Sequence, residues 1–229
     1  MGDWVRLKAD DGHELGAYVA TPAQAPIGAL VVVQEIFGVN SHIRSVADGY
    51  AKDGFLTIAP ALFDRIERDL QLNYDDDDMK KAFALYPKLN PDLSLLDVAA
   101  AFHHVAKAGK GTGVLGFCYG GLVSWLSATR GENLKMQPGC CVGYYAGGVG
   151  KFAAEEPVCP VMLHFGAEDS HIGKDQIDAV RSAHPDVEVY VYEGAGHAFN
   201  RDPHPAAYHE ASAKLARERS LKFLKENLA

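Results

Sequence analysis

The chain alternates short, uniformly apolar runs with longer amphipathic segments, and this alternation constrains its fold more than any other feature of the sequence. Strands that are apolar on both faces are typical of a parallel sheet covered by helices on both sides. Six runs have this character, and the predicted buried strands are 29–34, 55–60, 113–118, 141–145, 161–166 and 187–192. The sequence therefore predicts an α/β fold with a mostly parallel central sheet.

Amphipathic segments of helical length lie between these runs, and the sequence predicts helices over 40–52, 91–108, 119–130, 174–183 and 205–227. Asn40 or Ser41 and Asn90 are candidate N-caps, since these side chains accept hydrogen bonds from the free N–H groups of a first helical turn. Pro91 fits the first helical position, where its missing N–H is not needed. The caps therefore support the first two of these helices.

The N-terminal segment has a different pattern, in which apolar and polar residues alternate. This alternation runs to Ala9, is interrupted by Asp10–Gly12 and resumes over 13–20, which predicts an antiparallel hairpin. No internal repeat, low-complexity tract or linker divides the rest of the sequence. We therefore expect a single domain over 1–229, with the hairpin joined to the parallel sheet and helices on both faces.

Charge and composition exclude several classes of partner. The 22 Lys and Arg residues are outnumbered by 30 Asp and Glu residues, and the net charge of −8 disfavours nucleic acid or an anionic membrane as a partner. No apolar run is long enough for a membrane span and the N-terminus does not resemble a signal peptide, so we expect a cytoplasmic protein. We also expect a monomer or a weak homodimer with a small-molecule substrate.

No metal or organic cofactor is expected from the sequence. The four cysteines form no C-x-x-C pair, which indicates free thiols rather than disulfides or a zinc site. The run 75–78, D-D-D-D, lacks the glycine and distal glutamate of a calcium loop, so we interpret it as the N-terminal cap of a helix. His103, His104 and His164 lack the spacing of a zinc motif and are interpreted as structural.

The sequence G-F-C-Y-G-G at 116–121 places Cys118 between a predicted buried strand and the helix that follows. Small residues two positions away on either side, here Gly116 and Gly120, allow the sharp turn that lifts a nucleophile out of a sheet. The first N–H groups of the helix would favour a thiolate there and stabilise an oxyanion. A solitary buried cysteine is more often inert packing, so this motif alone is a weak signal.

Two later motifs strengthen the interpretation of Cys118 as a nucleophile. G-A-E-D at 166–169 and G-A-G-H-A-F at 194–199 each follow a predicted strand, so a nucleophile, an acid and a histidine occur in the order of α/β-hydrolases. Asp169 and His197 therefore complete a candidate triad with Cys118. The neighbouring Glu168 is the alternative acid, and Asp169 as a cap or His197 as a loop residue are the structural alternatives.

The sequence Q-E-I-F-G-V-N at 34–40 follows the first parallel strand and places the ionisable Glu35 directly after a buried run. An unpaired carboxylate there would be costly to bury, so we expect a partner that holds it. In the hydrolase topology this loop lies beside the nucleophile and supplies one oxyanion donor. The N–H of Ile36 is the expected donor, together with the N–H of Tyr119.

These four motifs together resemble the dienelactone hydrolase family, also called carboxymethylenebutenolidases, and the resemblance covers nearly the whole chain. It implies an α/β-hydrolase fold and hydrolysis of a small lactone or ester through a thioester on Cys118. It also implies that Glu35 holds the thiol in the resting enzyme and accepts its proton when substrate binds. His197 would then act with the thiolate, and Asp169 would orient and stabilise His197.

Family members that act on dienelactone bind the substrate carboxylate with two arginines. Arg201 matches the first, with a surface ion pair to Asp202 or another acid as the alternative. Near the second position, Met79 and Phe83 stand where an arginine and a tyrosine are expected. The resemblance therefore leaves open another small ester as the substrate. Three basic residues are candidate substitutes for the second arginine: Arg65, Lys80 and Lys81.

Several aromatic residues are candidate substrate contacts. Phe37 and Phe83 are expected to line the pocket, and so is Tyr144, with its neighbour Tyr145. Both tyrosines fit a place in the core equally well. The segment 62–78 could in addition close over the pocket.

Two further functions remain alternatives to a lactone hydrolase. One is a broad-specificity carboxylesterase or thioesterase of the same fold. The other is a protein that binds a ligand or senses redox state without turnover, for which a broken triad would be the discriminating feature.

Overall fold

The computed structural model describes residues 2–108 and 110–229. Eight strands of this part of the chain form one sheet in the order β1-β2-β4-β3-β5-β6-β7-β8. The strands are β1 Asp3–Lys8, β2 Glu14–Ala20, β3 Gly28–Val33, β4 Phe55–Pro60, β5 Thr112–Phe117, β6 Cys141–Tyr144, β7 Val161–Gly166 and β8 Glu188–Tyr192. All six predicted buried strands are present, with ends that differ by at most one residue.

Strand directions confirm the mostly parallel sheet. β4, β3, β5, β6, β7 and β8 pair in parallel, whereas β2 runs antiparallel to both β1 and β4. The N-terminal hairpin is therefore confirmed. Every residue of the central strands β3 and β5 is buried, as expected for strands covered on both faces.

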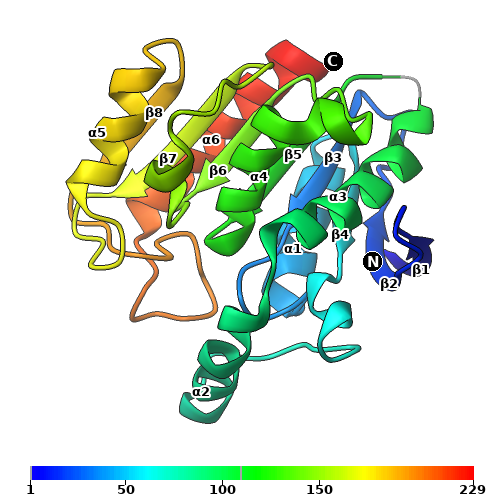
Figure 1. Cartoon of the computed structure of the whole chain (residues 1–229), viewed down its shortest axis with the longest axis horizontal. Helices are drawn as coiled ribbons and strands as arrows, with labels where there is room; N and C mark the ends of the chain where they lie inside the picture. The colour runs from blue at the N-terminus through cyan, green and yellow to red at the C-terminus, as the bar shows by residue number, and fades with distance from the viewer. Residues whose placement is uncertain (1, 109) are drawn as a thin grey trace.

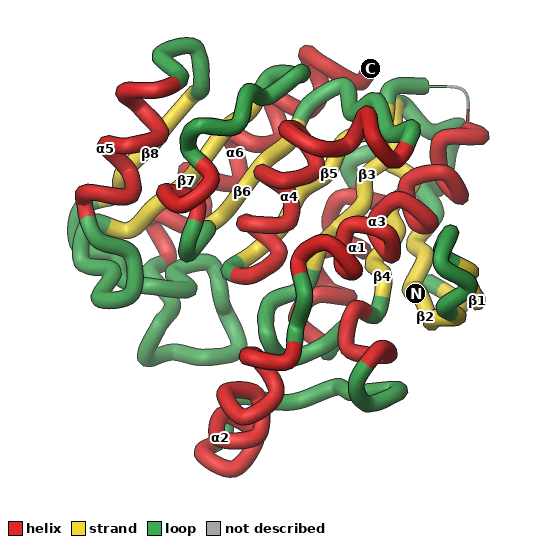
Figure 2. The backbone as a smooth tube through the Cα atoms, viewed as in Figure 1, coloured by secondary structure: helices red, strands yellow, loops and turns green. Residues whose placement is uncertain are grey.

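Helices cover both faces of this sheet (Figure 1). α3, α4 and α5 lie in front of the sheet in this view, and α1 and α6 lie behind it. Figure 2 shows the same layers by element type, with α2 projecting from the end of the molecule where the loop after β8 also lies. The helices are α1 Ser41–Lys52, α2 Asp76–Leu85, α3 Pro91–Val105, α4 Tyr119–Arg130, α5 Lys174–Ala183 and α6 Glu210–Leu228. Short 3-10 helices are η1 Leu62–Arg65, η2 Tyr86–Lys88, η3 Ala106–Ala108, η4 Gly131–Leu134 and η5 Val149–Phe152.

Helix caps agree with the sequence. Asn40 accepts a hydrogen bond from the N–H of Ile43 at the start of α1, and Asn90 caps α3 in the same way. Asp75 accepts hydrogen bonds from the N–H groups of Asp77 and Asp78, so the acidic run caps α2 as predicted.

Residues 2–108 and 110–229 contain no group of three or more His, Cys, Asp or Glu side chains arranged to hold a metal ion.

The predicted start of the last helix is wrong, because α6 begins at Glu210 and not at Pro205. The residues before it form consecutive turns, in which the N–H of His204 bonds to the carbonyl of Arg201 and the N–H of Ala207 bonds to that of His204. Pro203 and Pro205 favour turns, and the N–H of His209 bonds to the carbonyl of Phe199, which ties the end of these turns to the loop after β8. No helix in the described part of the chain has both the length and the apolar character to cross a membrane.

Candidate active site

Cys118 lies at the junction of β5 and α4 with φ 54° and ψ −115°, a conformation that few residues other than glycine adopt. The two flanking glycines make this turn possible. A Cβ on Gly116 would lie 1.9 Å from the carbonyl oxygen of Gly120, and one on Gly120 would lie 2.3 Å from that of Val33. The G-x-C-x-G spacing is therefore a steric requirement of the turn that raises Cys118 above the sheet.

His197 connects Cys118 to Asp169. Its Nε2 lies 3.3 Å from Sγ of Cys118, and its Nδ1 lies 2.7 Å from Oδ2 of Asp169. The other oxygen of Asp169 accepts hydrogen bonds from the N–H groups of His171 and Ile172, which fixes the buried carboxylate. Glu168 is exposed, so Asp169 is the acid that contacts the histidine.

These contacts determine the charge of His197. Burial opposes a charged imidazolium and lowers the pKa of His197, but hydrogen bonds and negative charge from Asp169 and Cys118 outweigh it and raise the pKa to about 10. The imidazole is therefore protonated at neutral pH, with one N–H directed at the carboxylate and one at the sulfur.

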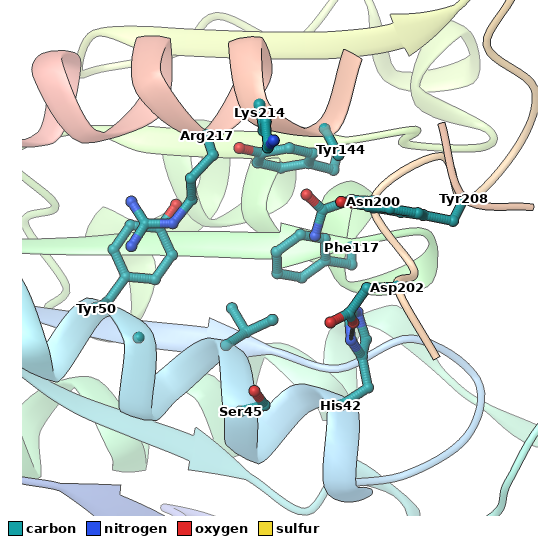
Figure 3. A pocket seen from close by; sticks show the side chains of 13 residues that line it. His42, Ser45, Tyr50, Phe117, Tyr144, Asn200, Asp202, Tyr208, Lys214 and Arg217 are labelled. Atoms are coloured by element: carbon teal, nitrogen blue, oxygen red, sulfur yellow. Dashed lines mark hydrogen bonds and ion pairs between the residues drawn. The ribbon is translucent and has the colours of Figure 1, made fainter. Parts of the chain in front are cut away.

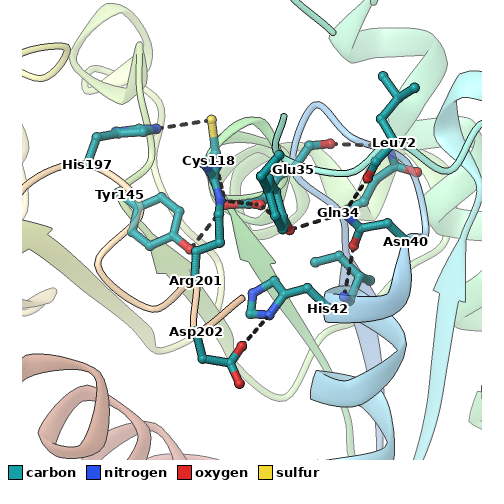
Figure 4. A network of polar contacts seen from close by, with 12 residues as sticks. Gln34, Glu35, Asn40, His42, Leu72, Cys118, Tyr145, His197, Arg201 and Asp202 are labelled. Carbon is teal, nitrogen blue, oxygen red and sulfur yellow. Dashed lines mark hydrogen bonds and ion pairs between the residues drawn. The ribbon is translucent and has the colours of Figure 1, made fainter. Parts of the chain in front are cut away.

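Glu35 is fully buried and forms a two-pronged ion pair with Arg201 (Figure 4). Nη2 of Arg201 lies 2.9 Å from Oε1 of Glu35, and Nε lies 3.1 Å from Oε2. The guanidinium stacks between two aromatic rings, with its Cζ 4.8 Å from the ring centre of Phe37 and 4.7 Å from that of Tyr74. Such a planar, bidentate partner is what a buried carboxylate requires.

Two tyrosines complete the surroundings of Glu35. The hydroxyl of Tyr145 donates to Oε1 at 3.3 Å, and that of Tyr74 donates to Oε2 at 3.4 Å. Burial would raise the pKa of Glu35, but the positive charge of Arg201, followed by that of His42, keeps it below the ordinary 4.5. Glu35 is therefore ionised at neutral pH.

The position of Glu35 differs from what the resemblance implies for a resting enzyme. The thiol of Cys118 contacts His197, and the carboxylate of Glu35 contacts Arg201 instead of the thiol. A guanidinium offers a charge-assisted bidentate pair that a thiol cannot match, which accounts for this choice of partner. The alternative surface pair of Arg201 with Asp202 is wrong as well, because Asp202 bonds to Nδ1 of His42 at 2.9 Å.

The two proposed oxyanion donors lie at the ends of adjacent strands. Tyr119 is the first residue of α4, and Ile36 follows β3 and lines the cavity above Cys118. Neither N–H has an acceptor within the described residues, although both residues are buried. Unsatisfied buried N–H groups are rare in proteins, so this pair is suited to receive an oxyanion.

A cavity of about 630 Å³ opens above Cys118, within the usual size range for small-molecule sites. Its wall is mostly apolar and is formed largely by the loop after β3, α2, the η5 turn and the loop after β8, with further residues from η2, the start of α4, the loop after β7 and α5. The predicted Phe37 and Phe83 both line it. The lining residues are Ile36, Phe37, Met79, Phe83, Tyr86, Cys118, Leu122, Gly147, Gly148, Lys151, Phe152, His171, Gln176, His197, Ala198, Arg201, His204 and Ala207.

Tyr144 does not line this cavity, and its expected role as a substrate contact is wrong. Its side chain points to the opposite face of the sheet, where it borders a separate groove between α1 and α6 (Figure 3). Its hydroxyl lies 2.7 Å from that of Ser220. Successive side chains of a strand point to opposite faces, so Tyr144 and Tyr145 could not both face the site.

The candidate substitutes for the second arginine lie elsewhere. Lys80 pairs with Asp77, Lys81 pairs with Glu67, and Arg65 lies between Asp11 and Asp97. None of the three lines the cavity. Of the histidines interpreted as structural, His164 is buried, its ring nitrogens contact the hydroxyls of Tyr192 and Ser220, and burial lowers its pKa to about 3.

The sequence did not indicate Tyr74, which reaches Glu35 from the segment 62–78. That segment packs on the loop after β3, where the side-chain amide of Asn40 donates to the carbonyl of Leu72 at 2.9 Å and to the hydroxyl of Tyr74 at 3.1 Å. No local motif marks such a contact between two loops. Tyr145, in contrast, is the last residue of the predicted strand 141–145, at the edge of the sheet that carries the site, and this position was a usable signal.

Comparison with known proteins agrees with the fold. The family model described as "Dienelactone hydrolase family" matches residues 15–228. A carboxymethylenebutenolidase from Pseudomonas putida is 31% identical over 98% of this chain and 96% of its own. A crystal structure from Klebsiella pneumoniae has a TM-score of 0.80 and 30% identity, covering 96% of this chain and 98% of that one. The metagenomic phosphotriesterase P91, 18% identical with a TM-score of 0.80 over 100% of this chain and 99% of its own, shares the fold. The chain therefore belongs to the dienelactone hydrolase family.

Proposed function

We propose that the protein hydrolyses a small lactone or ester through a thioester on Cys118. The observation that carries this proposal is the continuous chain from Sγ of Cys118 through His197 to Asp169, with contacts of 3.3 Å and 2.7 Å, beside two free N–H groups. A positioned nucleophile, a base held by a carboxylate and oxyanion donors are the parts that acyl transfer needs.

The reaction follows from this geometry. The thiolate of Cys118 attacks the carbonyl carbon, and the N–H groups of Ile36 and Tyr119 bind the resulting oxyanion. Collapse breaks the bond to the leaving oxygen, which takes the proton of His197 and leaves a thioester on Cys118. Neutral His197 then removes a proton from water, and the resulting hydroxide attacks the thioester. Collapse releases the carboxylic acid product and leaves the thiolate of Cys118 beside protonated His197.

Arg201 and Glu35 give the site a means of responding to a substrate carboxylate. A carboxylate bound to Arg201 would compete with Glu35 for the same N–H groups. Glu35 would then keep only its longer contacts with Tyr74 and Tyr145, and its burial would raise its affinity for a proton. In this scheme the resting thiol of Cys118 is neutral, and Glu35 accepts its proton only when substrate is bound, which forms the thiolate that attacks. Glu35 returns the proton to the sulfur after the product leaves.

Detection of the acyl-enzyme tests the proposal. Protein mixed rapidly with an activated aryl ester and quenched in acid should carry an acyl group on the peptide that contains Cys118, as read by mass spectrometry. Cys118→Ser should lose the thioester and most of the activity, whereas Cys159→Ser, which changes another partly buried thiol, should retain both. Turnover by Cys118→Ser at the unmodified rate would refute a thiolate mechanism.

The cavity also favours a second candidate, a broad-specificity esterase. Its wall is largely apolar, and the guanidinium of Arg201 is already paired with Glu35, so a neutral ester would not have to displace Glu35 from Arg201. Under this candidate, kcat/KM for neutral aryl esters should equal or exceed that for carboxylate-bearing lactones of the same size. A strong preference for the lactone would favour the first candidate.

A further inference from the structure

The charged residues that line the cavity are unusual for this chain. The sequence has 30 acidic and 22 basic residues, yet among the described residues around the cavity there is no Asp or Glu. The lining includes Arg201 and Lys151, and Arg201 is neutralised by its pair with Glu35. The net charge of the wall is therefore positive within an acidic protein.

Lys151 is the cation that remains. It is exposed, and it forms no ion pair with any side chain in the described part of the chain. The other lysines close to α2 differ in this respect, because Lys80 and Lys81 are paired with acidic partners away from the cavity. An ammonium group that borders a cavity without a counter-charge can attract an anion by Coulomb interaction, which solvent and salt screen in part.

The backbone that carries Lys151 is anchored on both sides. Lys151 belongs to η5, which is preceded by Gly148, and the N–H of Gly148 donates to Oε1 of Gln176 at 2.9 Å. On the other side, the indole N–H of Trp125 donates to the carbonyl of Phe152 at 3.2 Å. Gly148 and Phe152 line the cavity as well, so the anchored turn holds the backbone of Lys151, from which its side chain extends, at the cavity wall.

We propose that Lys151 determines substrate specificity by binding an anionic group of the ester or lactone substrate, such as a carboxylate on its acyl chain. The inference rests on the proposed hydrolytic function. It assigns the binding of the substrate anion to Lys151, the lysine that lines the cavity in the described part of the chain. The anion would lie between an apolar wall and the ammonium group, while the ester carbonyl reaches Cys118.

A pair of substrates tests this role. Para-nitrophenyl hemisuccinate carries a carboxylate on the acyl chain, and para-nitrophenyl pentanoate is neutral and of similar length. The ratio of kcat/KM for the anionic ester to that for the neutral ester should fall about fivefold in Lys151→Met, as expected for loss of a partly solvated ion pair. Lys151→Arg should retain the ratio, and so should the control Lys8→Met, on the exposed edge strand β1.

A second readout does not depend on hydrolysis. Iodoacetate is anionic and iodoacetamide is neutral, and both alkylate a thiol, so the ratio of their rates at Cys118 reports the attraction of anions into the cavity. This ratio should also fall in Lys151→Met, and it should fall in the unmodified protein as salt is added. A fall in the alkylation ratio without hydrolysis of either ester would support Lys151 and refute the hydrolytic function. Unchanged ester and alkylation ratios in Lys151→Met would overturn the inference.

Discussion

Replacement of Arg201 by methionine should destabilise the protein because it leaves a buried charge without its partner. Glu35 has no exposed surface, and its two short contacts of 2.9 Å and 3.1 Å both come from Arg201. The hydroxyls of Tyr74 and Tyr145 remain, at 3.4 Å and 3.3 Å. Loss of one partner of a buried ion pair typically costs about 3–5 kcal/mol, so we expect a loss of this size in the free energy of unfolding.

The pH dependence distinguishes this cause from a simple loss of packing. In the unmodified protein the pKa of Glu35 is below 4.5, so the pair stabilises the fold above that pH, and the contribution is lost as pH falls through the lowered pKa. Without Arg201, burial is the largest remaining influence and raises the pKa of Glu35, so the variant is destabilised most at high pH. The difference in stability between the two proteins should therefore shrink as the solution is acidified.

Urea unfolding at neutral pH and at about pH 5 measures both quantities, provided that the slope with denaturant is unchanged. Arg68→Met, which removes an exposed arginine, is the matched control and should change stability by less than about 0.5 kcal/mol. Glu35→Gln combined with Arg201→Met should recover part of the loss, since no charge is then buried. The reasoning fails if Arg201→Met loses less than about 1 kcal/mol, or if acidification leaves its deficit unchanged.

Two further substitutions test the roles of individual contacts. Asp169→Asn should lower kcat/KM about 10³-fold to 10⁴-fold and move the pKa of His197, followed by NMR, from about 10 toward 6.5. Since a raised histidine pKa stabilises the fold below 6.5 and this contribution is lost as pH rises toward about 10, the variant should lose stability mainly at neutral pH and below. Asp75→Ala should increase hydrogen exchange in the first turn of α2, by an amount that corresponds to about 1 kcal/mol, whereas Asp76→Ala, which removes no cap, should not.

The fold was predictable because its main determinants are local. Uniform apolar runs specify strands that are buried on both faces, and this pattern found all six parallel strands. Asn40, Asn90 and Asp75 each lie at the start of a predicted helix, where a side-chain oxygen can accept hydrogen bonds from the first turn, so their roles as caps could be deduced without tertiary structure. The start of α6 was misjudged because apolar periodicity was given more weight than Pro203 and Pro205.

The nucleophile region was predictable for a similar reason. The turn at Cys118 is so tight that Gly116 and Gly120 have no substitute, and the requirement is therefore visible in five consecutive residues. Asp169 and His197 follow strands whose carboxyl ends meet at one edge of the sheet, so topology alone brings them near Cys118. Their contacts needed no information beyond strand order.

The partner of Glu35 could not be deduced in this way, because it depends on loops that are far apart in the sequence. Arg201 comes from the turns before α6 and Tyr74 from the segment before α2, and neither position is fixed by a strand end. Competition decides the outcome: a buried carboxylate takes the partner that offers the most charge and the best geometry, which is a guanidinium and not a thiol. Under the proposed mechanism the same competition would make the site responsive, since a substrate carboxylate matches Glu35 in charge and shape and could replace it on Arg201. Specificity would then depend on a cation that is free before substrate arrives, which is the property that distinguishes Lys151 from Arg201.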